Sequence, residues 1–391
     1  MTENLPFKPA YLEHFDWEPT IRVQYGLGAL DKLGQAALEL GGKNVLLVTD
    51  QGLIDAGHVA KAAEFLKEAG LNVFIFTDVE ENPTTTCVEK CKAFALASGE
   101  IDLIVGLGGG SSMDCAKAVN FLLSNGGKME DYWGKGLAKK PMLPSIGIPT
   151  TAGTGSEAQR FALISDTATH RKMACGDIKA RFRVVLLDPT LVKSVPHTVA
   201  AHSGMDAITH ALESYVTSAR NAASQMFARE AWRLLERNFQ SVLDDPENIE
   251  AWSNMQLGAH YSGMAIESSM LGAAHATANP LTARFDVPHG VAVAMMLPHV
   301  MRFNTQVVGS LYTELAEVSG FRGSDAIDCL ISRVEALRTV AEMPGNPTEF
   351  GVREEHIQQL AHDATQQWTG TFNPRPASEE DFATLYRAAL S

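Results

Sequence analysis

Asp206 and His210, four positions apart, have the residue types and the spacing of a metal site. The segment around them has a helical pattern, so the two side chains should lie one above the other on the same face. Their neighbours are nearly all apolar, which predicts that this face is buried. A buried carboxylate needs a compensating charge, and a metal ion bound by the carboxylate and the imidazole together would supply it.

Two further histidines in the same half of the chain could complete this site. His275 lies among small residues within 272–280, and His289 has little bulk beside it within 287–292. One histidine in an apolar stretch is more often a core residue than a ligand. Three of them, together with the Asp206 spacing, favour a metal. One carboxylate and three imidazoles without a thiolate suit Fe(II) or Zn(II), with Mn(II) and Ni(II) as alternatives.

A run of three glycines, 108–110, follows a predicted strand and precedes Ser111 and a predicted helix. Backbone without Cβ atoms can approach a ligand closely, and the free N–H groups of the first helical turn suit a phosphate. A simple tight turn is an equal alternative. The loop is not a Walker loop, because no Gly-Lys-Ser/Thr follows it. It also differs from the usual Rossmann fingerprint, because the acid that could hold a ribose, Asp50, precedes the glycines.

Two other segments leave the ends of predicted strands. Asp50 lies at the carboxyl end of one strand, where open sheets bind their ligands. An acid there accepts hydrogen bonds from ribose hydroxyls and repels a 2′-phosphate, which favours NAD over NADP; a solvated turn residue is the alternative. Thr150 and Thr151 follow another strand, and their hydroxyls suit either a nucleotide wall or an ordinary loop.

The elements that must position these residues fall into two groups. Up to residue 149, apolar strand-like runs alternate with helical patterns, which predicts a parallel sheet covered on both faces. The predicted strands are 44–50, 72–77, 101–107 and 144–149. From about residue 200 the pattern is helical only, and the predicted helices are 201–218, 222–238, 249–267, 291–303, 312–318, 325–339, 353–367 and 379–390. The sequence therefore predicts an α/β domain over 1–195 and an all-helical domain over 196–391.

Composition restricts the class of protein and its partners. The chain has 391 residues, which favours two domains, with 45% hydrophobic and 20% charged residues. A net charge of -14 argues against nucleic acid and anionic membranes as partners. No apolar run approaches the roughly 20 residues of a spanning helix, and the start does not resemble a signal peptide. The five cysteines have no CxxC spacing and indicate reduced thiols in a cytoplasmic protein.

These motifs together resemble the group III, iron-activated alcohol dehydrogenases. The resemblance rests on segment 206–210 with His275 and His289, on 108–111 with Asp114, and on segment 149–157. It extends to the tail at residues 373–376. It implies a dehydroquinate synthase-like fold, with an α/β dinucleotide-binding domain and an all-helical metal-binding domain, and a homodimer. It also implies a divalent metal, Fe(II) first and Zn(II) second, bound by Asp206, His210, His275 and His289.

The resemblance further implies which residues bind NAD and where this sequence departs from the family. The implied cofactor residues are Asp50, Asn82, Gly109, Gly110, Ser111, Asp114, Thr150, Thr151 and Lys172. Several family members carry another histidine four residues after the third ligand, and here that catalytic position is Asn279. An amide can orient a substrate but cannot exchange a proton near neutral pH. Another group would therefore have to move the proton.

The predicted function is that of an NAD-dependent alcohol dehydrogenase that also reduces aldehydes or ketones. Hydride would pass between a metal-bound alkoxide and the nicotinamide. One alternative is a lyase like dehydroquinate synthase, but its sugar acid phosphate calls for several Lys and Arg side chains, and the sequence around the predicted ligands is poor in them. The other alternative is a non-catalytic binder, against which the intact set of predicted ligands argues.

Overall fold

The computed structural model describes residues 15–167 and 171–391, which divide into two compact units. Glu18–Val195 forms an α/β unit. Pro196–Ser391 forms a helical unit, which residues 15–17 join through the contact of the Trp17 ring with Phe227. The two classes of unit are those predicted from the sequence, a parallel α/β fold and an all-helical fold.

A six-stranded parallel sheet forms the centre of the α/β unit. The order of its strands is β1 (Arg22–Tyr25), β9 (Val184–Leu187), β6 (Ser145–Pro149), β4 (Leu103–Gly108), β2 (Asn44–Val48) and β3 (Asn72–Phe76). In the register of the central strands, Val45 lies opposite both Val73 and Leu103. Strands β4 and β6 are buried along their whole length. Burial on both faces explains why the central strands are continuous apolar runs in the sequence.

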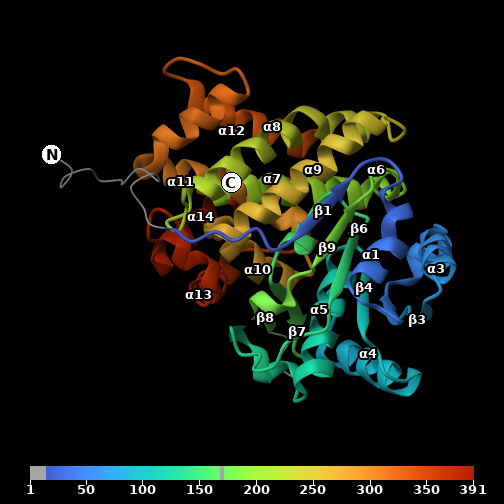
Figure 1. Cartoon of the computed structure of the whole chain (residues 1–391). Helices are drawn as coiled ribbons and strands as arrows, with labels where there is room; N and C mark the ends of the chain where they lie inside the picture. The colour runs from blue at the N-terminus through green and yellow to red at the C-terminus, as the bar shows by residue number, and fades with distance from the viewer. Residues whose placement is uncertain (1–14, 168–170) are drawn as a thin grey trace. The chain divides into compact units, whose positions relative to one another are not determined.

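Helices cover both faces of this sheet (Figure 1). Helices α1 (Leu33–Glu39) and α3 (His58–Glu68) pack on the face that includes Val45 and Leu47 of β2. Helices α4 (Thr85–Ser98) and α5 (Gly110–Asn125) pack on the other face, with Leu46 and Val48. Successive residues of one strand therefore enter two different cores, as the alternation of a pleated strand requires.

The chain reverses its direction of travel across the sheet at β2. It runs from β2 to its neighbour β3 and then crosses back to β4 on the other side of β2. The connection that leaves β2 therefore runs toward β3, whereas the connection that leaves β4 runs the other way, toward β6. In open parallel sheets this switch point is where ligands bind.

A smaller three-stranded sheet belongs to the same unit. Its order is β5 (Gly134–Lys135), β8 (Lys172–Gly176) and β7 (Phe161–Ser165), and β7 and β8 are antiparallel. None of these three strands was predicted from the sequence, and neither were β1 and β9 of the main sheet. The segments 134–135, 161–165 and 172–176 thus have more regular structure than the sequence indicates.

The helical unit is built around α7. Its main helices are α7 (His197–Val216), α8 (Ala222–Asp244), α9 (Ile249–Ser268), α10 (Ala273–Phe285), α11 (His289–Val318), α12 (Ala326–Val340), α13 (Ile357–Thr365) and α14 (Glu379–Leu390). From Gly204 to Val216 every residue of α7 is buried, because α8, α9 and α11 pack around it. A helix buried on all sides is apolar all round, and polar residues on it need a specific partner.

Two helices differ from the sequence prediction. The segment 291–303 and the segment 312–318 were predicted as separate helices, but α11 runs through both with a local break at Val308, where φ is -122°. Helix α10 was not predicted at all, and it contains Pro280 in its interior. Across residues 15–167 and 171–391, no helix combines the length and the apolar character needed to cross a membrane.

Candidate functional site

Three helices of the helical unit deliver the four predicted metal ligands. Asp206 and His210 lie one turn apart on α7, His275 is the third residue of α10, and His289 is the first residue of α11. Gly290 permits the last of these placements. A Cβ atom at this position would lie 2.1 Å from the carbonyl oxygen of His202 on α7. Only glycine therefore lets the start of α11 approach α7 within one turn of Asp206.

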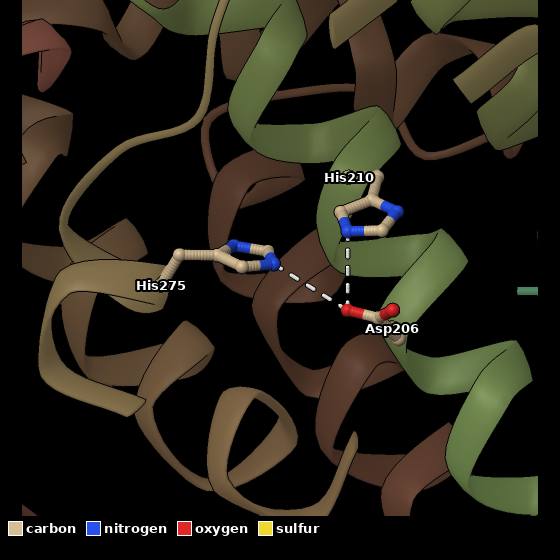
Figure 2. A group of neighbouring side chains, drawn as sticks. All are labelled: Asp206, His210 and His275. Carbon is tan, nitrogen blue, oxygen red and sulfur yellow. Dashed lines mark ion pairs between the residues drawn. The ribbon is translucent and has the colours of Figure 1, made fainter. Parts of the chain in front are cut away.

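The three imidazoles converge on one carboxylate oxygen. Oδ1 of Asp206 lies 3.1 Å from Nε2 of His210, 3.4 Å from Nε2 of His275 and 3.6 Å from Nε2 of His289. Figure 2 shows Asp206, His210 and His275 with their ring nitrogens directed at the carboxylate. The rings of His210 and His275 stack with centroids 4.9 Å apart. Asp206, His210 and His275 are buried, whereas the side chain of His289 is 31% exposed.

The spacing and the unmet polar atoms fit a divalent cation. A four-coordinate ion with ligands at about 2.1 Å holds neighbouring ligand atoms about 3.4 Å apart, close to the spacing seen here. Oδ1 of Asp206 and Nε2 of His275 are buried and make no hydrogen bond with any described residue. Buried polar atoms are normally satisfied, so this pair of atoms facing each other indicates a missing partner. The partly exposed side chain of His289 marks the side of the cluster that is nearest to solvent.

The pKa shifts in this cluster show that it favours a positive charge. Burial alone would raise the pKa of Asp206, but His210, His275 and His289 hold it well below its usual value. Burial alone would lower the pKa of His275, but the two carboxylates beside it, Asp206 facing Nε2 and Glu213 bonded to Nδ1, raise it to about 9. Without an ion, a proton on His275 compensates the carboxylates. A metal cation would take over that task and release the proton.

Glu213 was missed by the sequence analysis. One of its carboxylate oxygens lies 2.6 Å from Nδ1 of His275, and the other accepts a hydrogen bond of 2.7 Å from the backbone N–H of Ala274. A carboxylate behind a ligand histidine orients the ring and makes it a better donor to the metal. The sequence carried one signal for this role, because Glu213 follows His210 by three residues and so lies on the same face of α7.

Two predicted cofactor residues lie at the carboxyl ends of neighbouring strands, Asp50 at the switch point after β2 and Thr150 after β6. Asp50 caps the short helix α2 (Gln51–Asp55) by accepting from the N–H of Leu53, and it accepts a 3.1 Å hydrogen bond from the hydroxyl of Ser112 at the start of α5. Thr150, after β6, donates its backbone N–H to the carbonyl of Gly108 at 3.0 Å. The ends of β2, β4 and β6 are therefore linked into one rim, which includes the glycine loop.

The glycines of this rim lie against the threonine segment. A Cβ atom on Gly109 would lie 3.3 Å from the methyl group of Thr151, and one on Gly110 would lie 2.7 Å from that of Thr154. The loops that follow β4 and β6 thus pack at a distance that only small residues allow. The first N–H groups of α5 begin at this point, which is the arrangement that suits a phosphate group.

Three more of the predicted cofactor residues form a second group. The backbone N–H of Asn82 donates to the hydroxyl of Ser111 at 3.2 Å, and Nζ of Lys172 donates to Oδ1 of Asn82 at 3.1 Å. Asn82 has a positive φ of 53°, a conformation that asparagine tolerates better than most residues. The structure therefore brings together an amide, a hydroxyl and an ammonium group from three separate segments.

Asp114 is placed differently from the other candidates. It is buried in α5, where its oxygens accept from the hydroxyl of Ser156 at 2.5 Å and from the N–H of Leu163 at 3.1 Å. Lys117, which the sequence analysis did not single out, lies 3.1 Å from Asp114 and also donates to the carbonyl groups of Ser156 and Phe161. With these partners, the Asp114 carboxylate fastens α5 to the segment that follows Thr151.

Asn279 lies one turn after His275 on α10 and is half-buried. Its amide nitrogen donates to the side-chain oxygen of Gln367 at 3.0 Å. A pair of amides can hold a hydroxyl or carbonyl group in place, but neither amide can accept or release a proton near neutral pH.

A parallel sheet with a phosphate-type loop and a helical unit with a buried Asp–His centre define a metal- and dinucleotide-dependent class of enzyme. Comparison with known proteins identifies the family within this class. The model for "Iron-containing alcohol dehydrogenase" matches residues 19–189, and the model for the C-terminal part of the Fe-containing alcohol dehydrogenase family matches residues 200–390.

Similar proteins match over almost the whole chain. The 1,3-propanediol dehydrogenase of Klebsiella pneumoniae is 34% identical over 373 residues, which cover 94% of this chain and 96% of that protein. The NAD-dependent methanol dehydrogenase of Bacillus methanolicus is 33% identical over 370 residues, with 93% and 97% covered. A crystal structure of 1,3-propanediol oxidoreductase is similar with a TM-score of 0.92 at 33% identity, covering 97% of this chain and all 100% of the other.

The chain therefore belongs to the iron-containing alcohol dehydrogenase family. Its reaction class is that of a metal-dependent alcohol dehydrogenase or aldehyde reductase that uses NAD. This agrees with the fold and the reaction class predicted from the sequence, and it favours the dehydrogenase over the lyase and the non-catalytic binder.

Proposed function

We propose that this enzyme interconverts small alcohols and their aldehydes or ketones with NAD, at a divalent metal held by Asp206, His210, His275 and His289. The observation that carries the proposal is the convergence of three imidazole nitrogens within 3.6 Å of one buried carboxylate oxygen. A divalent ion bound there supplies Lewis-acid chemistry, which favours loss of the proton from an alcohol and polarises a carbonyl group.

The protein side chains bind and orient the reactants. Asp206 supplies the negative charge that attracts the cation, and the three histidines fix where it lies. Glu213 holds the ring of His275 through Nδ1, so that Nε2 faces Asp206 and would be free to bind the ion. Asn279, with Gln367, is proposed to orient the substrate rather than to carry its proton.

The proposed ion is Fe(II), with Zn(II) as the alternative. Three imidazoles and one carboxylate, with no thiolate, suit both ions. The family name supports iron.

The proposed NAD site is the rim formed by the ends of β2, β4 and β6. Gly109, Gly110 and Ser111 would bind the pyrophosphate at the start of α5. Asp50 would accept from the ribose hydroxyls and disfavour NADP. The rest of the cofactor would contact four further residues: Asn82, Thr150, Thr151 and Lys172. Asp114 would act by holding this rim together, because its oxygens already bond to Ser156 and Leu163.

The names of the relatives support short primary alcohols and diols, or the matching aldehydes, as substrates. We further propose a homodimer that works in the cytoplasm. Strand β1 lies at the edge of the sheet, with Val23 40% and the following Leu27 63% exposed, and exposed apolar edges pair with other chains. All five cysteines are free thiols, as expected in a reducing compartment. A monomeric mass by light scattering would contradict the dimer.

The proposed function is tested by metal analysis of freshly purified protein together with an NAD-linked assay on a panel of alcohols and aldehydes. We expect about one iron or zinc per chain and steady NADH formation from short alcohols. His275→Ala should lose both the metal and the activity. His58→Gln is the matched control, because His58 is a buried histidine that hydrogen-bonds Ser194 outside the metal cluster. Wild-type turnover in His275→Ala would refute the assignment.

A further inference from the structure

We infer that Glu213 and Asn373 are positioning residues that together hold the start of α10, and with it His275, in the orientation that binds the metal. The inference rests on the proposed metal site. It also assigns a structural role to the tail segment 373–376, which takes no part in the proposed metal or NAD site.

The first turn of α10 has no side-chain cap of its own. Gly272 occupies the N-cap position, and a helix start leaves backbone N–H groups that need acceptors. Two other elements supply these acceptors. The N–H of Ala273 donates to Oδ1 of Asn373 at 3.2 Å, and the N–H of Ala274 donates to Oε1 of Glu213 at 2.7 Å. Both alanines are fully buried, so water cannot replace either acceptor without a rearrangement.

The second oxygen of Glu213 connects this cap to the metal ligand. It lies 2.6 Å from Nδ1 of His275, which therefore carries the hydrogen and donates. In the neutral ring that would bind a metal, the lone pair is then on Nε2, the atom that faces Asp206 at 3.4 Å. One carboxylate thus fixes the backbone before His275, the rotation of its ring and its tautomer.

Asn373 is itself held tightly. Its amide nitrogen donates to Oδ1 of Asn304 at 2.7 Å and to the carbonyl of Arg375 at 2.6 Å, and Asn304 donates back to Oδ1 of Asn373 at 3.0 Å. The guanidinium of Arg375 lies 3.8 Å from the centre of the Phe303 ring and donates to the carbonyl of Phe303. The tail is therefore fastened to α11, and its Asn373 reaches from there to the start of α10.

Both acceptors, Oδ1 of Asn373 and Oε1 of Glu213, lie close to Gly272. A Cβ atom there would lie 3.0 Å from Oδ1 of Asn373 and 3.0 Å from Oε1 of Glu213. Any side chain at 272 must push both acceptors away, although it touches no metal ligand. Gly272→Ala therefore disturbs the proposed positioning without removing a polar group.

The test uses cobalt as the probe. The metal-free protein is titrated with Co(II) in competition with a chelating dye, and the visible spectrum of the bound Co(II) is recorded. We expect Glu213→Gln to weaken cobalt binding by about 10- to 100-fold and to shift the cobalt bands, as loss of a partner behind a ligand does. Glu236→Gln is the matched control. It removes a buried glutamate paired with Arg333 in the same unit, and it should leave both readouts unchanged.

A second pair of variants keeps the test decisive if Glu213→Gln does not fold. Gly272→Ala should weaken cobalt binding several-fold, whereas Gly309→Ala should not, because a Cβ atom at 309 meets nothing closer than 3.5 Å. Wild-type affinity and spectrum in Glu213→Gln, or in Gly272→Ala if the first variant is unfolded, would overturn the inference. A wild-type protein that binds no cobalt would instead overturn the metal site on which the inference rests.

Discussion

Oδ1 of Asp206 sets the chemistry of the helical unit at the scale of single residues. It is buried, three imidazole nitrogens face it, and it has no hydrogen-bond donor among the described residues. An isolated buried carboxylate is costly, so the folded chain needs a cation at this point, whether a proton on His275 or a metal ion. Glu213 increases the need for a cation, because it brings a second carboxylate to His275.

Asp50 provides a test of the proposed cofactor site at the same scale. Asp50→Asn keeps one oxygen that can cap α2 and places an amide N–H₂ group, which can donate to the hydroxyl oxygen of Ser112, where the second oxygen was; it removes the negative charge. A 2′-phosphate should then be rejected less, and we expect the ratio of kcat/KM for NAD over NADP to fall by about tenfold, or ~1.4 kcal/mol. Asp55→Asn, at the exposed end of α2, is the control. An unchanged ratio in Asp50→Asn would exclude Asp50 as the selective residue.

Residues that act through local spacing were visible in the sequence, and those that act through distant contacts were not. Asp206 and His210 were recognised because one helical turn separates them. Glu213 lies on the same face, but its partner His275 is 62 residues further on, and nothing in the sequence joins the two. The same holds for Lys117, whose partners Ser156 and Phe161 come from other elements.

Elements were predicted well where burial gives a simple pattern. The strands β2, β4 and β6 are buried on both faces and appear as continuous apolar runs. Edge strand β1 is largely exposed and short, so its sequence carries no such pattern. Helix α10 was missed because Pro280 interrupts it and small residues dominate its first turns. Tertiary contacts hold it instead, including the hydroxyl of Tyr386 on the carbonyl of Thr277.

Lys117 provides a test at the scale of elements, because it joins α5 to Ser156 and to β7. Lys117→Met leaves the carboxylate of Asp114 buried without its cation. We expect the free energy of unfolding of the α/β unit to fall by about 3–5 kcal/mol in chemical denaturation. Lys90→Met removes an exposed ion pair with Glu80 and should cost less than about 1 kcal/mol. Equal losses in the two variants would contradict a structural role for the Lys117 network.

At the scale of the whole molecule, the two proposed ligands belong to different units. All the predicted cofactor residues lie in Glu18–Val195, and all the predicted metal ligands lie in Pro196–Ser391. Each unit also has its own core. A ligand that binds one unit should therefore stabilise the helices or loops of that unit first, because binding stabilises what it contacts.

Hydrogen exchange with and without a chelator tests this separation. An ion held at 100 times its dissociation constant stabilises its site by about 2.7 kcal/mol. Removing the ion should therefore speed exchange in α7, α10 and the start of α11, and leave the sheet of the α/β unit unchanged. NAD should slow exchange in the loops after β2, β4 and β6. The variant His275→Ala serves as the control, since its exchange should no longer respond to the chelator. If chelation instead loosened both units equally, the ion would be supporting the whole fold, and its assignment to the Asp206 centre alone would be wrong.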